Sequence, residues 1–122
     1  MHETLSYIAR ELAKRGYKIT EEASIRGIAG FSYKFDLIVE DPSTKKKVSL
    51  MYVEEVDARH VIPILAIRYG MDMKHVIICT SSDEHAARLL REAGITVLSF
   101  ESISDSSKLL EFIEKIFKEN KG

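Results

Sequence analysis

The stretch that decides the fold runs from residue 24 to residue 57 and reads SIRGIAGFSYKFDLIVEDPSTKKKVSLMYVEEVD. Apolar residues dominate two segments of it, 35–39 and 48–56, and a polar connection with Pro42 lies between them. Two apolar segments joined by turn-forming residues are typical of a β-hairpin. Asp36 opens the first strand, and the second strand finishes in an acidic cluster. We therefore expect two neighbouring strands to bring carboxylates together.

Helix and strand patterns surround this hairpin on both sides. Upstream, apolar residues at helical spacing predict an amphipathic helix that includes Leu5 and ends at Gly16. The other predicted elements are a short strand over 17–20, a flexible loop or irregular strand over 24–32, a helix over 58–69, a strand over 75–80, a helix over 82–93, a strand over 95–100 and a helix over 106–118. The order α-β-β-β-α-β-α-β-α predicts an α/β fold, with helices flanking a mixed β-sheet.

Two of these helices carry further expectations. The helix over 58–69 has few charges, so we expect it to be buried on more than one side. Pro63 suits only the first turn of a helix, which moves the expected start toward His60, with Asp57 as a candidate cap. In the last helix Phe112 lies off the apolar stripe, which makes it a candidate contact in a homodimer.

Composition limits the classes of function. The chain has 122 residues and 45% hydrophobic content, which fits one domain over residues 1–122. Its formal net charge is −1, so any attraction to nucleic acid has to be local. Cys79, the single cysteine, lies in an apolar run and is expected to be a buried thiol in a reducing compartment. No signal pattern and no apolar run of about 20 residues is present, so the expected location is the cytoplasm, away from membranes.

Four segments together resemble a known family. They are the first helix with Glu3 followed by GYKI, the glycine-containing segment SIRGIAGFSYKFD, the strand ending YVEEVD, and HAARLLREAGITVLSF. Their order and spacing resemble the restriction endonuclease-like (PD-(D/E)xK) superfamily, and within it the Mrr-type branch with the archaeal Holliday junction resolvases. The resemblance covers most of the chain. It implies a restriction endonuclease-like fold and an ancestral divalent-metal-dependent endonuclease.

The resemblance also implies site residues. In this family an Asp at the start of the second core strand and a Glu in the next strand bind Mg²⁺ or Mn²⁺, and a Lys two residues after the Glu assists the attacking water. Asp36 matches the first position and Glu54 the second, which leaves Val56 at the lysine position. Counting from Glu55 instead leaves Asp57 there. Neither side chain can offer positive charge to a phosphate, so the lysine is missing in both registers.

Lys34 is a candidate replacement for the missing catalytic lysine. It lies two residues before Asp36, and alternate residues of a strand share a face. The alternative is that Lys34 is an ordinary solvated residue at the mouth of a loop. The acidic residues have a similar alternative, because a charged strand end and a helix cap also use carboxylates.

Basic residues in the loops are the candidates for contacts with nucleic-acid phosphates. They lie in loops that we expect at one end of the sheet, and they are Arg26, Lys34, Lys45, Lys46 and Lys47. A lysine-rich hairpin tip is also typical of an ordinary exposed turn. The histidines lack the spacing of zinc ligands.

Two classes of function remain open. The first is a nuclease-related nucleic-acid-binding domain, for DNA or a structured nucleic acid, with degenerate or lost metal-dependent phosphodiesterase activity. The second is a non-catalytic module on a nuclease-like fold that regulates or binds a protein partner. A nucleotide-binding α/β domain comes last, because no glycine-rich fingerprint joins a strand to a helix.

Overall fold

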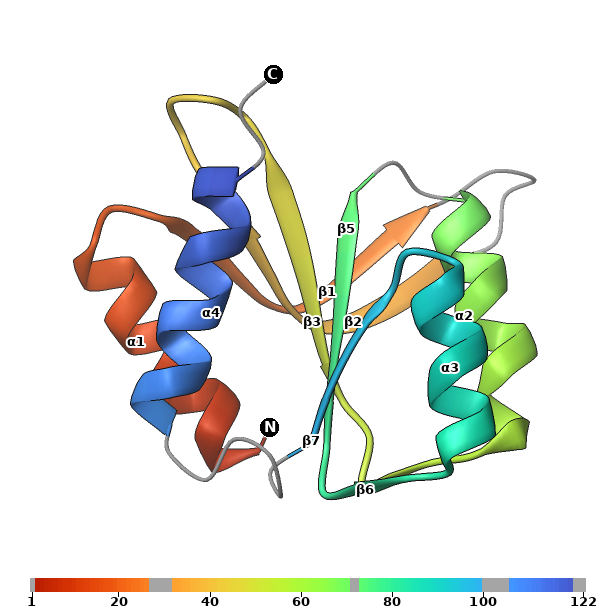
Figure 1. The fold of residues 1–122 in the computed structure, drawn as a ribbon. Coiled ribbons are helices and arrows are strands. Elements are labelled where there is room, and N and C mark those ends of the chain that lie inside the picture. Colours follow the sequence, from red (N-terminus) through yellow and green to blue (C-terminus); the bar gives the residue numbers. More distant parts are fainter. Residues whose placement is uncertain (1, 27–31, 71–72, 100–105, 120–122) are drawn as a thin grey trace.

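Helices and strands follow one another in the order that the residue patterns predict (Figure 1). The computed structural model describes residues 2–26, 32–70, 73–99 and 106–119. Its elements are α1 (Glu3–Lys14), β1 (Lys18–Arg26), β2 (Ser32–Glu40), β3 (Lys47–Tyr52), β4 (Glu55–Val56), α2 (Ala58–Gly70), β5 (Lys74–Cys79), β6 (Ser81–Ser82), α3 (Glu84–Glu92), β7 (Thr96–Ser99) and α4 (Ser106–Glu119).

The main sheet of the described residues has five strands in the order β1-β2-β3-β5-β7. Strands β1, β2 and β3 pair antiparallel, whereas β3, β5 and β7 pair parallel, so the sheet is mixed as predicted. Helices α1 and α4 cover one face of the sheet, and α2 and α3 cover the other (Figure 1). The predicted α/β architecture is confirmed. The short parallel pair of β4 and β6 was not predicted, because two residues are too few to show a period.

The core consists of apolar layers on both faces of the sheet. Along β5, Val76 and Ile78 pack in the cluster with α1 and α4, whereas Ile77 and Cys79 pack in the cluster with α2 and α3. A strand covered on both faces shows a continuous apolar run, which is the pattern that β5 has in the sequence. Cys79 is a buried free thiol, as expected. Phe112 of α4 is partly buried against the first of these clusters.

Helix α2 departs from two expectations. It begins at Ala58 rather than near His60, and Pro63 lies inside it. Its start is fixed by Asp57, whose carboxylate accepts a hydrogen bond of 3.0 Å from the Arg59 amide, as a capping residue does. Pro63 is tolerated because it lies on the exposed side, where water can reach the carbonyl that a proline leaves unbonded.

The expected burial of α2 on more than one side is wrong. Val61 and Ile64 face the core, but Ile62 is 74% exposed. The helix covers the sheet with one side only, and its other side is apolar without being covered by the described residues. None of the helices in the described part of the chain is long and apolar enough to cross a membrane.

Of the two expectations for 24–32, a flexible loop or an irregular strand, the strand is the one that the structure supports over 24–26. Ser24 to Arg26 complete β1, and Arg26 pairs with Ser32 at the start of β2. Gly27 and Gly30, which suggested the loop, lie outside the described residues.

Candidate functional site

Asp36 lies where the β1–β2 hairpin bends. Glu22 of β1 lies opposite Asp36 of β2. Between 18–26 and 32–40, all other pairs of opposite residues are paired in the β-ladder, and this pair is not. Glu22 has φ of 47°, in the left-handed region that residues with a side chain rarely adopt. Leu37 packs with the α1–α4 cluster, whereas Phe35, two residues earlier, packs in a cluster with Ile67 of α2. The alternate side chains of β2 therefore change from one face of the sheet to the other at Asp36.

The bend frees the Asp36 side chain to bond to the neighbouring strand. The β2–β3 ladder ends with Leu37 opposite Leu50. Beyond that pair, the Asp36 carboxylate accepts a hydrogen bond of 2.7 Å from the backbone amide of Tyr52. The Tyr52 ring stacks on His2, with ring centroids 4.1 Å apart. Asp36, the carboxyl end of β3 and the amino end of α1 consequently lie together.

Glu54 follows the end of β3 and is held by its backbone. Its carbonyl accepts hydrogen bonds from the Thr80 hydroxyl at 2.6 Å and from the Thr80 and Ser81 amides at 3.1 and 3.2 Å. The Glu54 side chain is exposed. It borders an open hollow of about 500 Å³ that is lined by Val53, Glu54, Glu55, Arg59, His60, Thr80 and Ser81. Asp36 is not among the described residues that line this hollow, although both predicted metal ligands lie at the same end of the sheet.

Both candidate positions for the missing lysine have structural roles. Val56 is fully buried in the core cluster with α2 and α3. Asp57 caps α2, and its Oδ2 accepts a hydrogen bond of 2.7 Å from the Arg59 guanidinium. That hydrogen bond is the main cause that lowers the pKa of Asp57 to about 2. For Asp57, the alternative interpretation as a helix cap is thus the one that the structure supports.

Lys34 is exposed on β2, two residues before Asp36. Lys34 and Asp36 share a face only where the strand alternates regularly. Because the side chains change face between Phe35 and Leu37, this condition does not hold at Asp36. Spacing alone therefore does not bring the Lys34 ammonium to the Asp36 carboxylate.

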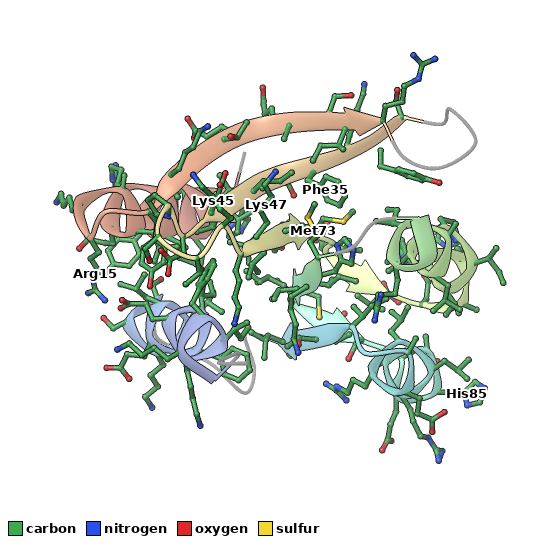
Figure 2. All side chains as sticks on the ribbon, turned by 90° about the horizontal axis from the view of Figure 1, so that it is seen from above. Arg15, Phe35, Lys45, Lys47, Met73 and His85 are labelled. Atoms are coloured by element: carbon green, nitrogen blue, oxygen red, sulfur yellow. The ribbon has the colours of Figure 1, made fainter. Side chains whose placement is uncertain are left out.

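A divalent metal fits these residues poorly. Within residues 2–26, 32–70, 73–99 and 106–119, no group of three or more His, Cys, Asp or Glu side chains is arranged to hold a metal ion. One oxygen of Asp36 is already engaged with the Tyr52 amide. Three histidines lie apart from Asp36: His60 on α2 near Asp57, His75 on β5 beside Ser49, and His85 on the outer side of α3 (Figure 2). The fourth, His2, stacks on Tyr52, and its Nδ1 accepts a hydrogen bond from the Thr4 amide.

The three hairpin lysines lie at the other end of β3. Lys45, Lys46 and Lys47 line a hollow of about 600 Å³ together with Arg68, Met73, Lys74 and Gly94. Five strand steps of about 3.3 Å separate Lys47 from Tyr52, or roughly 17 Å. The expectation that all five basic candidates gather at one end of the sheet is wrong. Lys34 lies near the beginning of β2, whereas Lys45 follows the end of β2, at the opposite end of the sheet.

Sequence reasoning missed several residues of the two hollows. Thr80 and Ser81 follow the parallel strand β5, and residues at the carboxyl ends of parallel strands commonly line ligand sites. That rule was the available signal for them. Arg68 and Lys74 are distant in sequence from the hairpin lysines, so no local pattern connects them.

Comparisons with known proteins support the fold. No protein-family model matches the chain. An uncharacterised protein of Archaeoglobus fulgidus is 30% identical over 123 residues, which cover 97% of this chain and 95% of that protein.

The crystal structure of a repair endonuclease from Pyrococcus abyssi aligns with a TM-score of 0.50 and 21% identity over 78% of this chain. The chain spans only 43% of that endonuclease. An EndoMS structure in complex with double-stranded DNA aligns with a TM-score of 0.49 and 20% identity, over 80% of this chain and 42% of that one. The alignment with the Pyrococcus abyssi endonuclease confirms the restriction endonuclease-like fold.

Proposed function

The chain belongs to the same family as the uncharacterised Archaeoglobus fulgidus protein, and from its endonuclease-like fold we propose that it is a nuclease-related nucleic-acid-binding domain. Its metal-dependent phosphodiesterase activity is degenerate or lost. The endonuclease-like fold supports the first statement, and the residues around Asp36 support the second.

The observation that carries the proposal is the identity of the residue beside Asp36. That residue is Tyr52, which donates its amide to the Asp36 carboxylate, and Glu54 follows two positions later. If Tyr52 is taken as the position where the family has its glutamate, then Glu54 falls at the position of the family's lysine. This third register also lacks the lysine, as do the registers that begin at Glu54 and Glu55.

The missing groups matter for chemistry. Phosphodiester cleavage needs positive charge where negative charge develops and a group that activates the attacking water. A glutamate in the place of the lysine would repel the phosphate instead. Asp36 and Glu54 are the proposed remnants of the metal site, with Lys34 as the proposed substitute base. Glu54 borders the hollow beside Thr80, and Asp36 is not among the described residues that line it.

Binding of nucleic acid requires local positive charge, since the whole chain carries −1. Arg26 and Lys34 are exposed on the bent arm of the β1–β2 hairpin. They are proposed to contact phosphates there, on the two strands that lead to Asp36. Contacts of this kind position a nucleic acid without reading its sequence.

The test is a binding and cleavage assay on the same samples. The full chain is titrated against labelled linear and branched DNA, with Mg²⁺, with Mn²⁺ and with a chelator. We expect binding in all three conditions, weaker with Mg²⁺ or Mn²⁺ only because the cations screen the phosphates, and intact DNA on a denaturing gel. The Arg26→Gln/Lys34→Gln variant should bind several-fold more weakly, and Lys108→Gln on α4 should not. Absence of binding by the wild type overturns the proposal.

A second candidate function has one observation in its favour. Ile62 on α2 is 74% exposed and Leu89 on α3 is 40% exposed. A contiguous apolar patch is typical of protein-binding surfaces, and these two side chains lie on the same layer of helices. A non-catalytic module that binds a protein, including a second copy of this chain, would use them. Sedimentation of wild type and Ile62→Ser tests the homodimer: a dimer that dissociates in the variant would support this function.

A further inference from the structure

The hollow beside the hairpin lysines has a composition that suggests a ligand. We define the lysine pocket as the hollow lined by Lys45, Lys46, Lys47, Arg68 and Lys74, with Met73 and Gly94 between them. We propose that the lysine pocket is a phosphate-binding site for the nucleic-acid backbone, separate from the Asp36 end of the sheet. This inference rests on the proposed function for the choice of nucleic acid as the source of the phosphates.

The hairpin turn holds its lysines in a closed backbone structure. The Asp41 amide donates to the Lys46 carbonyl at 3.0 Å, and the Lys45 amide donates to the Asp41 carbonyl at 2.8 Å. Lys45 itself has φ of 66°, in the left-handed region. Seen from above in Figure 2, Lys45, Lys47 and Met73 lie between the α1–α4 pair and the α2–α3 pair. The turn therefore presents its charges toward the middle of the sheet's end.

Asp41, the acidic residue of this turn, forms hydrogen bonds within the turn itself. The Asp41 carboxylate accepts hydrogen bonds from the Ser43 hydroxyl at 2.8 Å and from the Ser43 amide at 2.9 Å. These hydrogen bonds, the hydroxyl first, lower the pKa of Asp41. Asp41 does not line the lysine pocket, so its charge is used to build the turn.

The sheet brings Arg68 and Lys74 to the hairpin. Strand β5 pairs parallel to β3 with Lys74 opposite Val48, the residue after Lys47. Arg68 lies in the last turn of α2, directly before the connection to β5. A Cβ at Gly94 would lie 3.6 Å from Arg68 Nε, so the guanidinium passes close over this glycine, which has φ of 89°. Residues from three separate parts of the chain thus meet in one hollow.

The positive charge exceeds what the fold itself needs. Helix α2 ends beside the lysine pocket, and Gly94 follows the end of α3. Each helix carboxyl end carries about half a negative charge, which together offset about one of the five cations. In the described part of the chain, none of the five forms an ion pair with a carboxylate. Like charges held together in this way repel, and a bound anion would relieve the repulsion.

The lining also indicates how the ligand is recognised. Its described lining residues supply ammonium and guanidinium groups, which are phosphate ligands, and among these described residues there is neither an aromatic ring for stacking on a base nor an acidic side chain. Such a site detects the charge of the backbone and not the identity of the bases. We therefore expect binding that is independent of sequence and strongly dependent on salt.

The experiment compares two charge-matched variants of the full chain. Lys45→Gln/Lys74→Gln changes the lysine pocket, and Arg10→Gln/Lys108→Gln removes the same charge from exposed positions on α1 and α4. Fluorescence anisotropy with two labelled duplexes of unrelated sequence is measured over a range of NaCl concentrations. Circular dichroism melts confirm that all proteins are folded.

We expect the pocket variant to weaken binding of both duplexes about tenfold or more and to reduce the slope of log K against log salt by about 2, one unit for each lost phosphate contact. The control variant should change affinity less than about threefold. Equal weakening by both variants, or an unchanged salt slope, overturns the site.

A parallel calorimetric titration with inorganic pyrophosphate separates the site from the proposed function. If the wild type binds no duplex but binds pyrophosphate, and the pocket variant does not, the phosphate site stands with a free phosphate compound as its source, and the nucleic-acid function fails. If duplex DNA binds equally to wild type and pocket variant, the function stands and the site fails. If neither ligand binds, both fail.

Discussion

The Asp36 carboxylate accepts a hydrogen bond of 2.7 Å from the backbone amide of Tyr52, and this bond ties β2 to β3 beyond the end of their ladder. The residue that the family resemblance assigns to metal binding therefore has a structural role in this chain. A structural role is sufficient to explain an aspartate at this position, even where no catalysis remains.

Replacement of Asp36 should separate the hydrogen bond from the charge. In Asp36→Ala the Tyr52 amide, which is partly buried, loses its acceptor, and we expect a loss of about 1–3 kcal/mol in the free energy of unfolding. Asp36→Asn keeps an acceptor oxygen and should lose about 1 kcal/mol or less. Urea denaturation measures both, with Glu111→Ala on the exposed side of α4 as the control. Equal losses for Ala and Asn would show that the hydrogen bond is not what the carboxylate contributes.

The positive φ of Glu22 predicts that a glycine there does not lower the free energy of unfolding, unlike a glycine elsewhere in the strand. Glycine adopts the left-handed region at no steric cost, so Glu22→Gly should leave stability unchanged or raise it by up to about 1 kcal/mol. Glu22→Val should lower it by about 1–2 kcal/mol, because a β-branched residue is strained there. Glu21→Gly, one residue away, should instead lose about 0.5–1 kcal/mol as an ordinary strand glycine does. Similar losses for the two glycine variants would contradict the bend.

Asp57 predicts a change of stability with pH. Its pKa is lowered from 3.8 to about 2, chiefly by the hydrogen bond from Arg59, so between these values the unfolded chain binds more protons than the folded one. The contribution of Asp57 is thus complete above about pH 4 and is lost as the pH falls toward 2. Asp57→Asn keeps a capping side chain but removes the charge. Melting temperatures from pH 5 to pH 2 should converge for wild type and variant, and parallel curves would refute the assignment.

Helix α2 offers a matched pair of isoleucines. Ile64 is 5% exposed and Ile62 is 74% exposed. Ile64→Ala should cost about 2–5 kcal/mol through lost burial and the cavity that remains. Ile62→Ala, at the exposed position, should change the free energy of unfolding by less than about 0.5 kcal/mol. A large loss at Ile62 would mean that a second molecule covers this side of the helix.

The strands and helices with a clear period were predictable from sequence. Strand β5 has a continuous apolar run because both of its faces are covered, and α4 shows one apolar stripe because it has one covered face. The order of these elements is sufficient to predict a mixed sheet between helices. The burial of α2 was not predictable, because Ile62 and Ile64 look alike in the sequence while only one of them faces the sheet.

The site was less predictable for two physical reasons. The left-handed backbone at the bend belongs to a glutamate, Glu22, so the sequence has no glycine there that would predict it. The apolar alternation continues through Asp36, so the reversal of faces between Phe35 and Leu37 leaves no trace in the pattern. The lysine pocket depends on the register of β5 against β3, which is a property of the folded sheet and not of any local segment.

The most direct test of the account is a calorimetric titration of Mg²⁺ and Mn²⁺ into wild type and Asp36→Ala, with cleavage of linear and branched DNA assayed on the same samples. We predict no cleavage and no metal uptake that depends on Asp36. Metal binding and DNA cleavage that both disappear in Asp36→Ala would contradict this prediction and establish a working nuclease.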